Sequence, residues 1–236
     1  MSDVDLFEAE TAVLTRATQV VASGADEPEQ YRQALEELVK SYGRLMRESR
    51  RLIARSDRTE RELNQLNSKL QQLTDELDYK ARHDNLTGAL NRGAIFERAH
   101  HFLKTTSLSL VVLDIDFFKR INDEFGHPTG DAVIRELVNR LRHTLNGEGE
   151  VGRVGGEEFT ILLPGVSLDA AVVIAEEIRL AIVQEAFPCL PSRPVTSSFG
   201  ISWSDVGADF EDAYARADAA LYKAKHGGRN RVERDA

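Results

Sequence analysis

Between residues 35 and 77, apolar or small side chains recur at an alternating spacing of three and four residues. This spacing is the heptad seam of a coiled coil, which requires one long helix whose apolar side is buried by another helix. We therefore expect an α-helical coiled-coil stalk over about residues 35–80 that self-associates as a parallel homodimer. The alternative is a lone helix packed on its own globular domain. The seam positions are Leu35, Leu38, Tyr42, Leu45, Ser49, Leu52, Ser56, Thr59, Leu63, Leu66, Leu70, Leu73 and Leu77.

The seam differs in strength along its length. Every seam position from Leu63 to Leu77 is leucine, which predicts firm pairing in this part of the stalk. Ser49, Ser56 and Thr59 make the middle of the seam polar. Pairing in the middle should therefore be weak.

A further helical segment precedes the stalk. Residues 3–22 form a modest amphipathic pattern that ends before Gly24, and Pro28 suits the first turn of the next helix. Residues 1–82 thus predict a helical N-terminal region on which a regulatory protein partner could act. Arginine is dense between residues 44 and 61. This density indicates either a solvated helix face with local ion pairs or a docking surface for an acidic partner.

Composition excludes several classes of protein. The formal net charge of −9 argues against a general affinity for nucleic acid or for an anionic membrane surface. The single cysteine, Cys189, excludes an intrachain disulfide and fits a reducing compartment. The acidic start MSDVDLFEAE lacks the features of a signal peptide, and the apolar runs are too short to span a bilayer. We expect a soluble, cytoplasmic protein with no nucleic-acid partner and no membrane insertion.

From residue 83 onward, strand-like and helix-like segments alternate, with turn residues between them. A few strands with helices between them predict an α/β (α+β) domain over 83–236, in which helices cover a central mixed sheet. We expect helices at 94–104, 131–145, 168–183 and 210–226, strands at 107–116 and 195–203, and a hairpin at 151–163.

Two pairs of carboxylates stand out in this domain. Asp114 and Asp116 close the strand LVVLDID, and their spacing of two places both side chains on one face. Strand ends of α/β sheets are common ligand sites, although such a pair could simply begin a loop. Glu157 and Glu158 form the second pair, in the hairpin VGRVGGEEFTILL. One sheet could bring the two pairs together.

This pattern favours a site for a metal ion and a phosphate. Clustered carboxylates on strand ends suit hard Mg²⁺ ions, and two such ions can hold both oxygens of an in-line displacement at phosphorus. Gly155 and Gly156 precede the glutamates. Glycine tolerates positive φ and leaves its backbone bare, so phosphate oxygens could approach the amide groups. The bend is therefore predicted to hold a triphosphate and a metal together.

Five dispersed motifs occur in one order along the globular part. They are DNLTGALNR (84–92), LDIDFFKRINDEFGHPTGD (113–131), RVGGEEF (153–159), SSFGIS (197–202) and ALYKAKHGGRNRV (220–232). In this order they resemble the GGDEF domain of bacterial diguanylate cyclases, over about residues 80–234. The chain has the GGEEF variant, and it is similar to short stand-alone cyclases with a helical N-terminus and no recognisable sensor domain. The resemblance implies that two molecules of GTP are condensed into cyclic di-GMP.

The resemblance also implies roles for individual residues near the metal. The side chain of Asp114, the carbonyl of Ile115 and the side chain of Glu157 would bind Mg²⁺, with Mn²⁺ as an alternative. Glu157, or the environment that it shares with Glu158, would assist deprotonation of the attacking 3′-hydroxyl. The division of roles between these two glutamates stays open. Arg153 would support the hairpin.

Other residues would hold the nucleotide. Asn122 and Asp131 would read the guanine edge, because a carboxylate can accept from N1–H and N2–H. Lys225 and Arg229, taken as one helical turn apart, would hold the terminal phosphates. Plainer explanations exist: Asn122 as a loop polar group, Asp131 as a helix cap, and the two cations as complements of a helix dipole. The remaining contacts implied are Phe117, Phe118, Lys119, Gly155 and Gly156.

One domain holds one GTP, so the active site of such a cyclase exists only when two domains face each other. The stalk would raise the local concentration of the second domain. A polar mid-seam predicts low basal activity until a partner stabilises the pair. A nucleotide-binding regulator without turnover and a coiled-coil adaptor are the competing hypotheses. Many such cyclases also carry an inhibitory Arg-x-x-Asp site, but residues 146–149 read Asn-Gly-Glu-Gly, so product inhibition there should be absent or much weakened.

Overall fold

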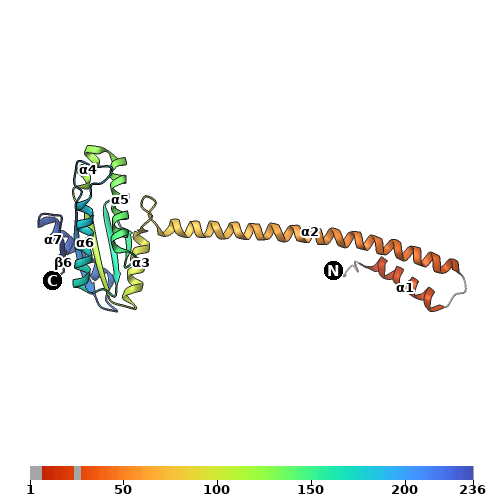
Figure 1. Ribbon diagram of the computed structural model, residues 1–236. Coiled ribbons are helices and arrows are strands. Elements are labelled where there is room, and N and C mark those ends of the chain that lie inside the picture. The colour runs from red at the N-terminus through yellow and green to blue at the C-terminus, as the bar shows by residue number, and fades with distance from the viewer. Residues whose placement is uncertain (1–6, 24–27, 236) are drawn as a thin grey trace. The chain divides into compact units, whose positions relative to one another are not determined.

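The computed structural model describes residues 7–23 and 28–235. The chain divides into two compact units, residues 1–74 and 75–236, each of which is considered by itself (Figure 1). Residues 3–6 of the first predicted helix, and Gly24 after it, lie outside the described residues. Within the described ranges, no helix combines the length and the apolar character that crossing a bilayer requires.

The predicted long helix is confirmed as α2, which runs without interruption over Pro28–Arg82 for 55 residues. Proline stands at its first position, where a missing N–H costs no hydrogen bond. The leucine part of the seam is exposed, with Leu66 at 57% and Leu70 at 53%. Such a row of apolar side chains is costly to leave in water. Self-association through this row stays a prediction.

The first helix, α1 over Glu8–Ser23, lies along the beginning of α2. Arg44 donates to Glu10 at 2.6 Å, and Arg16 pairs with Glu37 at 3.6 Å. Leu38, one of the seam positions, lines a shallow hollow together with residues of α1. The first part of the seam is therefore shared with α1, whereas the sequence analysis assigned all of it to a second α2.

The globular unit confirms the predicted mixed sheet. Its six strands have the order β1-β3-β4-β2-β5-β6, and only the β1–β3 and β5–β6 pairs are parallel. The two edge strands were not predicted, because two and three residues are too short to show a period. The strands are β1 (Leu90–Asn91), β2 (Leu108–Ile115), β3 (Glu150–Arg153), β4 (Glu158–Pro164), β5 (Ser197–Ser204) and β6 (Val232–Arg234).

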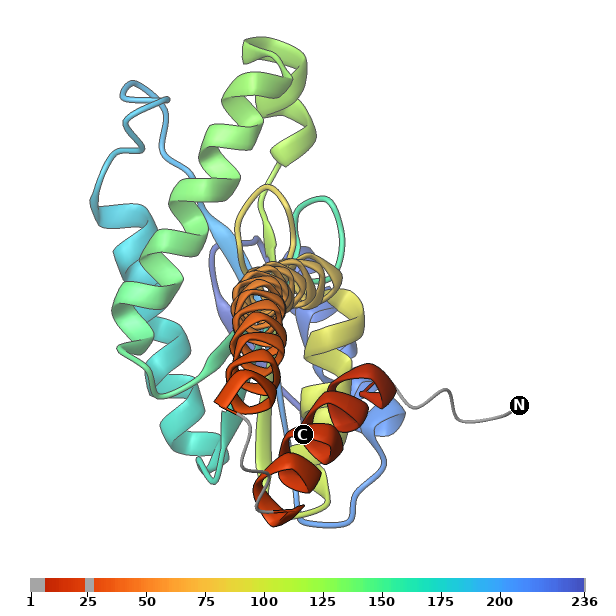
Figure 2. The same ribbon diagram turned by 90° about the vertical axis from the view of Figure 1, so that its right-hand side faces the viewer.

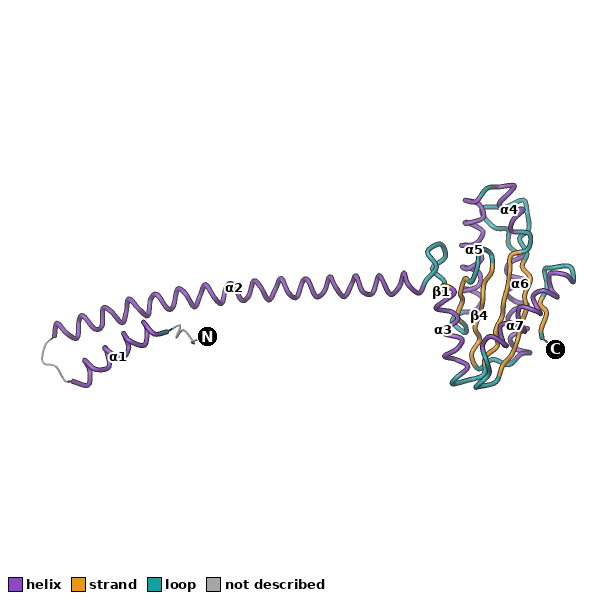
Figure 3. Tube along the Cα trace, turned by 180° about the vertical axis from the view of Figure 1, so that it is seen from behind, coloured by secondary structure: helices purple, strands orange, loops and turns teal. Residues whose placement is uncertain are grey.

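Helices cover both faces of this sheet (Figures 2 and 3). All eight residues of β2 are buried, and their side chains alternate between two cores. Val111 and Leu113 join the core that includes α5 and α6, whereas Leu110 and Val112 join the core of α3 and α7. The helices are α3 (Arg92–Leu103), α4 (Phe118–Phe125), α5 (His127–Leu145), α6 (Leu168–Gln184) and α7 (Phe210–His226).

Helix α5 begins earlier than the sequence analysis predicted. It starts at His127 rather than at residue 131, directly after Gly126, whose φ of 83° few other residues adopt. Pro128 occupies its first turn. Asp131 therefore lies inside the helix, and its alternative explanation as a helix cap is wrong.

Gly200 is required where α7 crosses β5. A Cβ atom at this position would lie 2.1 Å from the backbone N of Leu221 and 2.2 Å from the carbonyl O of Ala217. Because backbone atoms of a packed helix cannot move aside cheaply, we expect Gly200→Ala to destabilise the globular unit by about 3 kcal/mol. Urea unfolding followed by fluorescence of the single Trp203 measures this free energy.

Gly156→Ala is the matched control in the same unit, because a Cβ there would meet no atom within 4 Å. Its unfolding free energy should stay within about 0.5 kcal/mol of the unchanged protein. Equal stability of the two variants would contradict the packing argument.

Candidate active site

The candidate site begins with Asp114 at the end of the central strand. Asp114 is paired with Glu158 on β4 and with Ser198 on β5, so neighbouring strands flank it on both sides. Only 6% of the residue is exposed. Its carboxylate accepts from Nζ of Lys225, on the last turn of α7, at 2.8 Å. A buried carboxylate and a lysine ammonium thus meet where β2 ends.

The glycine–glutamate bend joins β3 to β4 beside this strand end. The N–H groups of Val154 and Gly155 donate to the carbonyl of Glu158, at 2.9 and 3.3 Å, and close the bend. The N–H of Ile115 donates to the carbonyl of Glu157 at 3.3 Å. The sheet therefore brings the two acidic pairs together. Glu157 is half-buried, whereas Glu158 is exposed.

Backbone conformation does not require the two glycines of the bend, and only Gly155 has a close neighbour. Neither Gly155 nor Gly156 has a positive φ, so that part of the sequence argument was wrong. Gly156 faces open space, and a Cβ on Gly155 would lie 2.8 Å from the carboxylate of Glu158. The bend thus leaves a bare stretch of backbone over which the Glu158 side chain folds back.

Electrostatics at the strand end favour a bound cation. Burial raises the pKa of Asp114 despite the opposing Lys225 ammonium, and Glu158 and Asp116 add to this rise. Burial also raises the pKa of Glu157, and the charge of Asp114 adds to it. Crowded, partly desolvated carboxylate oxygens suit a hard divalent ion.

The protein alone offers such an ion few ligands. Among the described residues, no three His, Cys, Asp or Glu side chains are arranged to hold a metal together. Mg²⁺ in enzymes often takes one or two carboxylates and completes its shell with water and substrate phosphates. Asp114 and Glu157 fit this sparse donor set.

Asn122 and Asp131 lie at one junction. Asn122 is on α4, and its Oδ1 would be only 2.0 Å from a Cβ added to Gly130 on α5. The amide of Asn122 therefore fills the space that the missing side chain leaves. Asp131 is the next residue of α5, so the structure brings the two candidate guanine contacts into one region.

The turn between β2 and α4 presents three of the predicted contacts. Phe117 adopts a left-handed backbone conformation with φ of 56°, and 44% of it is exposed. Phe118 is buried in the core beside α5, so its side chain is structural. Lys119 is exposed on the first turn of α4. The first residues of α4 follow the strand end that carries Asp114, at a helix N-terminus that suits an anion.

Lys225 and Arg229 are not one helical turn apart, as the sequence analysis assumed. Helix α7 ends at His226, and two glycines follow it. Arg229 lies beyond them in a left-handed conformation, with φ of 63°. Its guanidinium carbon is 4.3 Å from the centre of the Phe117 ring. Arg229 thus contacts the β2–α4 turn from the loop after α7, whereas Lys225 contacts Asp114 from the last turn of the helix.

This geometry can be compared with known proteins. Residues 81–231 match the family described as diguanylate cyclase, GGDEF domain. The chain belongs to the GGDEF family. It is similar to diguanylate cyclase DgcP of Pseudomonas aeruginosa, with 43% identity over 161 residues that cover 65% of this chain and 24% of DgcP. The chain therefore spans about a quarter of the length of this curated relative.

Two solved structures extend the likeness to the helical part. The coiled coil and GGDEF domain of DgcB from Caulobacter crescentus, in complex with c-di-GMP, has a TM-score of 0.67 and 31% identity, and the match covers 78% of this chain and 98% of that one. Diguanylate cyclase SiaD from Pseudomonas aeruginosa, in complex with its activator SiaC, has a TM-score of 0.63 and 28% identity, covering 97% and 88%. The predicted resemblance to GGDEF proteins with a stalk, of the SiaD kind, is confirmed.

Arg153 connects the bend to the start of the GGDEF domain. Its guanidinium donates to the carbonyl of Gly156 at 3.2 and 2.7 Å, and to the carboxylate of Asp84 at 3.1 and 3.2 Å. Hydrogen bonds from Thr87 and Arg153 lower the pKa of Asp84, although burial opposes them. Sequence reasoning missed Asp84. Its position at the start of the motif DNLTG, two residues after the long helix, was the available signal.

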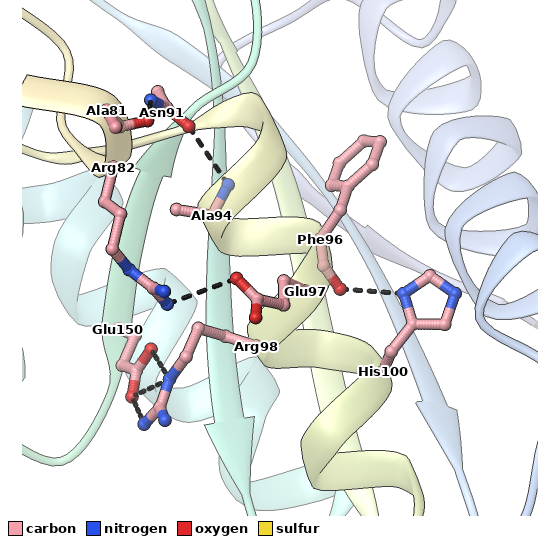
Figure 4. A network of polar contacts seen from close by, with 9 residues as sticks. All are labelled: Ala81, Arg82, Asn91, Ala94, Phe96, Glu97, Arg98, His100 and Glu150. Carbon is pink, nitrogen blue, oxygen red and sulfur yellow. Dashed lines mark hydrogen bonds and ion pairs between the residues drawn. The ribbon is translucent and has the colours of Figure 1, made fainter. Parts of the chain in front are cut away.

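A second polar network fastens the last turn of α2 to the GGDEF domain (Figure 4). The side chain of Asn91 donates to the carbonyl of Ala81 at 2.6 Å and accepts from the N–H of Ala94 at 3.0 Å. Arg82 pairs with Glu97 on α3 at 3.3 Å. The end of α2 is thereby held against the first elements of the domain.

Residues 146–149, where the inhibitory Arg-x-x-Asp motif would lie, also leave no space for its aspartate side chain. A Cβ on Gly149 would lie 2.8 Å from Cδ2 of Leu163 and 2.9 Å from the carbonyl O of Leu162. The position that would carry the aspartate therefore has no room for one. Weak product inhibition through this site stays a prediction.

The raised pKa of Glu157 generates a test of the metal site. Its folded-state pKa lies above the usual value of 4.5, so its charged form disfavours folding at neutral pH and its protonation favours folding. Without divalent ions, we expect Glu157→Gln to raise the unfolding temperature at about pH 7.5, and the gain to shrink as pH falls to about 5. Thermal unfolding in a chelating buffer at several pH values measures this.

Adding Mg²⁺ should then stabilise the unchanged protein more than Glu157→Gln, because the ion binds the folded state through the carboxylate. Glu148→Gln is the control, since Glu148 is exposed and lies outside the bend. If Glu157→Gln lowered the unfolding temperature of the metal-free protein at neutral pH, burial and the Asp114 charge would not destabilise the charged Glu157, and the argument for the metal site would be wrong.

Proposed function

We propose that the protein is a diguanylate cyclase that condenses two GTP into cyclic di-GMP and two pyrophosphates, at a site formed between two GGDEF domains. The observation that carries this proposal is the hydrogen-bonded meeting of the Asp114 strand end with the Glu157 bend. Lys225 lies at the same point. Membership of the GGDEF family and the likeness to DgcP support the same activity.

Asp114, Glu157 and the carbonyl of Ile115 would hold Mg²⁺, with Mn²⁺ as an alternative. When bound, the ion offsets the charge that develops on phosphate oxygens. The ammonium of Lys225 now balances Asp114. With a cation bound, Asp114 would no longer need Lys225 to balance its charge. Lys225 would then be free to turn toward the terminal phosphates of GTP, beside Arg229.

The rest of the nucleotide would be held from both sides of the strand end. Asn122 and Asp131 would read the guanine edge. Backbone N–H groups would contact the phosphates, and the exposed Lys119 would add a positive charge. The residues that would offer these N–H groups are Phe117, Phe118, Lys119, Gly155 and Gly156.

The chemical step exchanges one phosphoester bond for another. The 3′-oxygen of one GTP forms a bond to the α-phosphorus of the other, the bond from that phosphorus to pyrophosphate breaks, and the step occurs twice. Glu157, or the environment that it shares with Glu158, would assist removal of the 3′-hydroxyl proton, which leaves to solvent. Glu158, which is exposed and lies over Gly155, would stabilise the bend beside it.

We further propose that the N-terminal helices control the activity. Two domains must face each other, and the exposed leucine row of α2 would hold a homodimer together. The polar middle of the seam would leave that pair loosely aligned. SiaD, whose likeness to this chain extends through the helical region, is bound to an activator, SiaC. A regulatory protein acting on α1 and α2 fits both observations.

The activity itself is tested with GTP and Mg²⁺. The unchanged protein should form cyclic di-GMP, and Glu157→Ala should lose at least about 100-fold in turnover, because the metal loses one of its two carboxylates. Chromatography of the products measures this, and Glu148→Ala is the control, which should keep full activity. Nucleotide binding without any product would instead identify a regulator, and neither binding nor product would identify an adaptor.

The stalk is tested by placing a charge in its seam. Leu70→Glu should weaken the dimer and lower turnover per molecule about tenfold at low protein concentration, with recovery as the concentration rises. Ser68→Glu is the control, since position 68 lies outside the seam. Turnover that is unchanged in Leu70→Glu at low concentration would argue against pairing through α2.

A further inference from the structure

Asp116 lies two residues beyond Asp114, and the proposed chemistry does not use it. Only 5% of it is exposed. We propose that Asp116 is a positioning residue, which holds the turn after α7 so that Arg229 faces the terminal phosphates of the nucleotide. This inference rests on the proposed function, in which Arg229 contacts those phosphates.

The carboxylate of Asp116 joins three separate segments. One oxygen, Oδ2, accepts from the hydroxyl of Thr196 at 2.7 Å and from the backbone N–H of Asn230 at 3.0 Å. The other, Oδ1, accepts from the hydroxyl of Ser198 at 2.7 Å. Its own N–H donates to the carbonyl of Thr196 at 2.9 Å. The end of β2, the start of β5 and the turn after α7 thus meet on one buried side chain.

The turn that Asp116 holds is strained. Arg229 and Asn230 are consecutive residues with φ of 63° and 45°, a region that residues other than glycine rarely adopt. Such a conformation persists only where surrounding contacts fix it. Asp116 bonds the backbone of Asn230, and Arg179 donates to the Asn230 side chain at 3.0 Å. Together with the bond from the N–H of Arg229 to the carbonyl of Ala224 at 3.0 Å, these contacts fix the turn.

The strain has a consequence for Arg229. In this conformation its guanidinium lies over the Phe117 ring, 4.3 Å from the ring centre. Phe117 follows Asp116 directly in the chain and is itself left-handed, with φ of 56°. The buried carboxylate of Asp116 therefore bonds the strained turn at Arg229 and Asn230, and Asp116 is followed directly by the strained Phe117. The side chains of Arg229 and Phe117 are in contact. Without the Asp116 carboxylate, the turn would relax and Arg229 would leave the phosphate side of the site.

The test is a double-mutant cycle in the full chain, read by binding of two guanine nucleotides. The probes are GMP and a GTP analogue with a carbon bridge between the α- and β-phosphorus, which cannot lose pyrophosphate. Asp116→Ala and Arg229→Ala should each weaken binding of the analogue about tenfold. The double variant should be no weaker than Arg229→Ala alone, because Asp116 acts through Arg229. GMP affinity should not change.

Two further variants separate positioning from general stability. Asp116→Asn should restore analogue binding to within about threefold, because its amide oxygen can accept from Asn230 and the Ser198 hydroxyl can accept from its NH₂. Ser109→Ala is the control: it removes a buried hydroxyl at the other end of β2, bonded to the Val166 carbonyl at 2.8 Å, and should leave both affinities unchanged. If Asp116→Ala does not fold, Thr196→Val removes one donor to the same carboxylate and should weaken only analogue binding, by about threefold.

Several results would overturn the inference. Additive losses in the cycle, or equal losses for GMP and the analogue, would show that Asp116 does not act through Arg229, while the phosphate role of Arg229 would stand. No effect of Arg229→Ala would remove the phosphate role itself, and the inference with it.

Discussion

The arrangement of the site depends on one carboxylate, Asp114, that is buried near the end of the central strand. Burial of this charge costs free energy. Strand β2 is central, so its hydrogen bonds to β4 and β5 hold Asp114 in place on both sides. The side chain cannot move into solvent, and burial disfavours its charged form. Lys225 relieves that penalty in part. The remaining imbalance makes this point of the molecule attractive to a divalent cation.

The same strand end organises the groups around it. Asp114, in β2, pairs with Lys225 of α7, and Asp116, directly after β2, accepts from the backbone N–H of Asn230 in the turn that follows α7. Two carboxylates at one strand end therefore contact both segments that carry Lys225 and Arg229. The bend with Glu157 is bonded to the residue between the two aspartates. A small displacement of β2 would therefore move the proposed metal ligands and the proposed phosphate contacts together. Such coupling suits a reaction in which metal and triphosphate must be aligned.

Much of this arrangement could be predicted from the sequence, because it follows from local patterns. The heptad spacing specified α2, and a short apolar run, LVVLDI, specified β2 as a buried strand. The motifs located Asp114 at a strand end and Glu157 in a hairpin of the same sheet. The predictions that were wrong depended on backbone geometry, which side-chain patterns do not encode. The start of α5 at His127 follows from the conformation of Gly126, and the position of Arg229 follows from a left-handed turn fixed by distant groups. Asp84 was missed because its partner, Arg153, is 69 positions away in the chain.

The ion pair between Asp84 and Arg153 has a mechanical consequence. Asp84 stands two residues after the last residue of α2, and Arg153 also grips the carbonyl of Gly156 in the bend. The guanidinium of Arg153 thus links the loop after α2 to the glycine bend, in addition to the ties of Ala81 to Asn91 and of Arg82 to Glu97. Loss of this one side chain would release the bend from Asp84 and break its bond to the carbonyl of Gly156 at the same time.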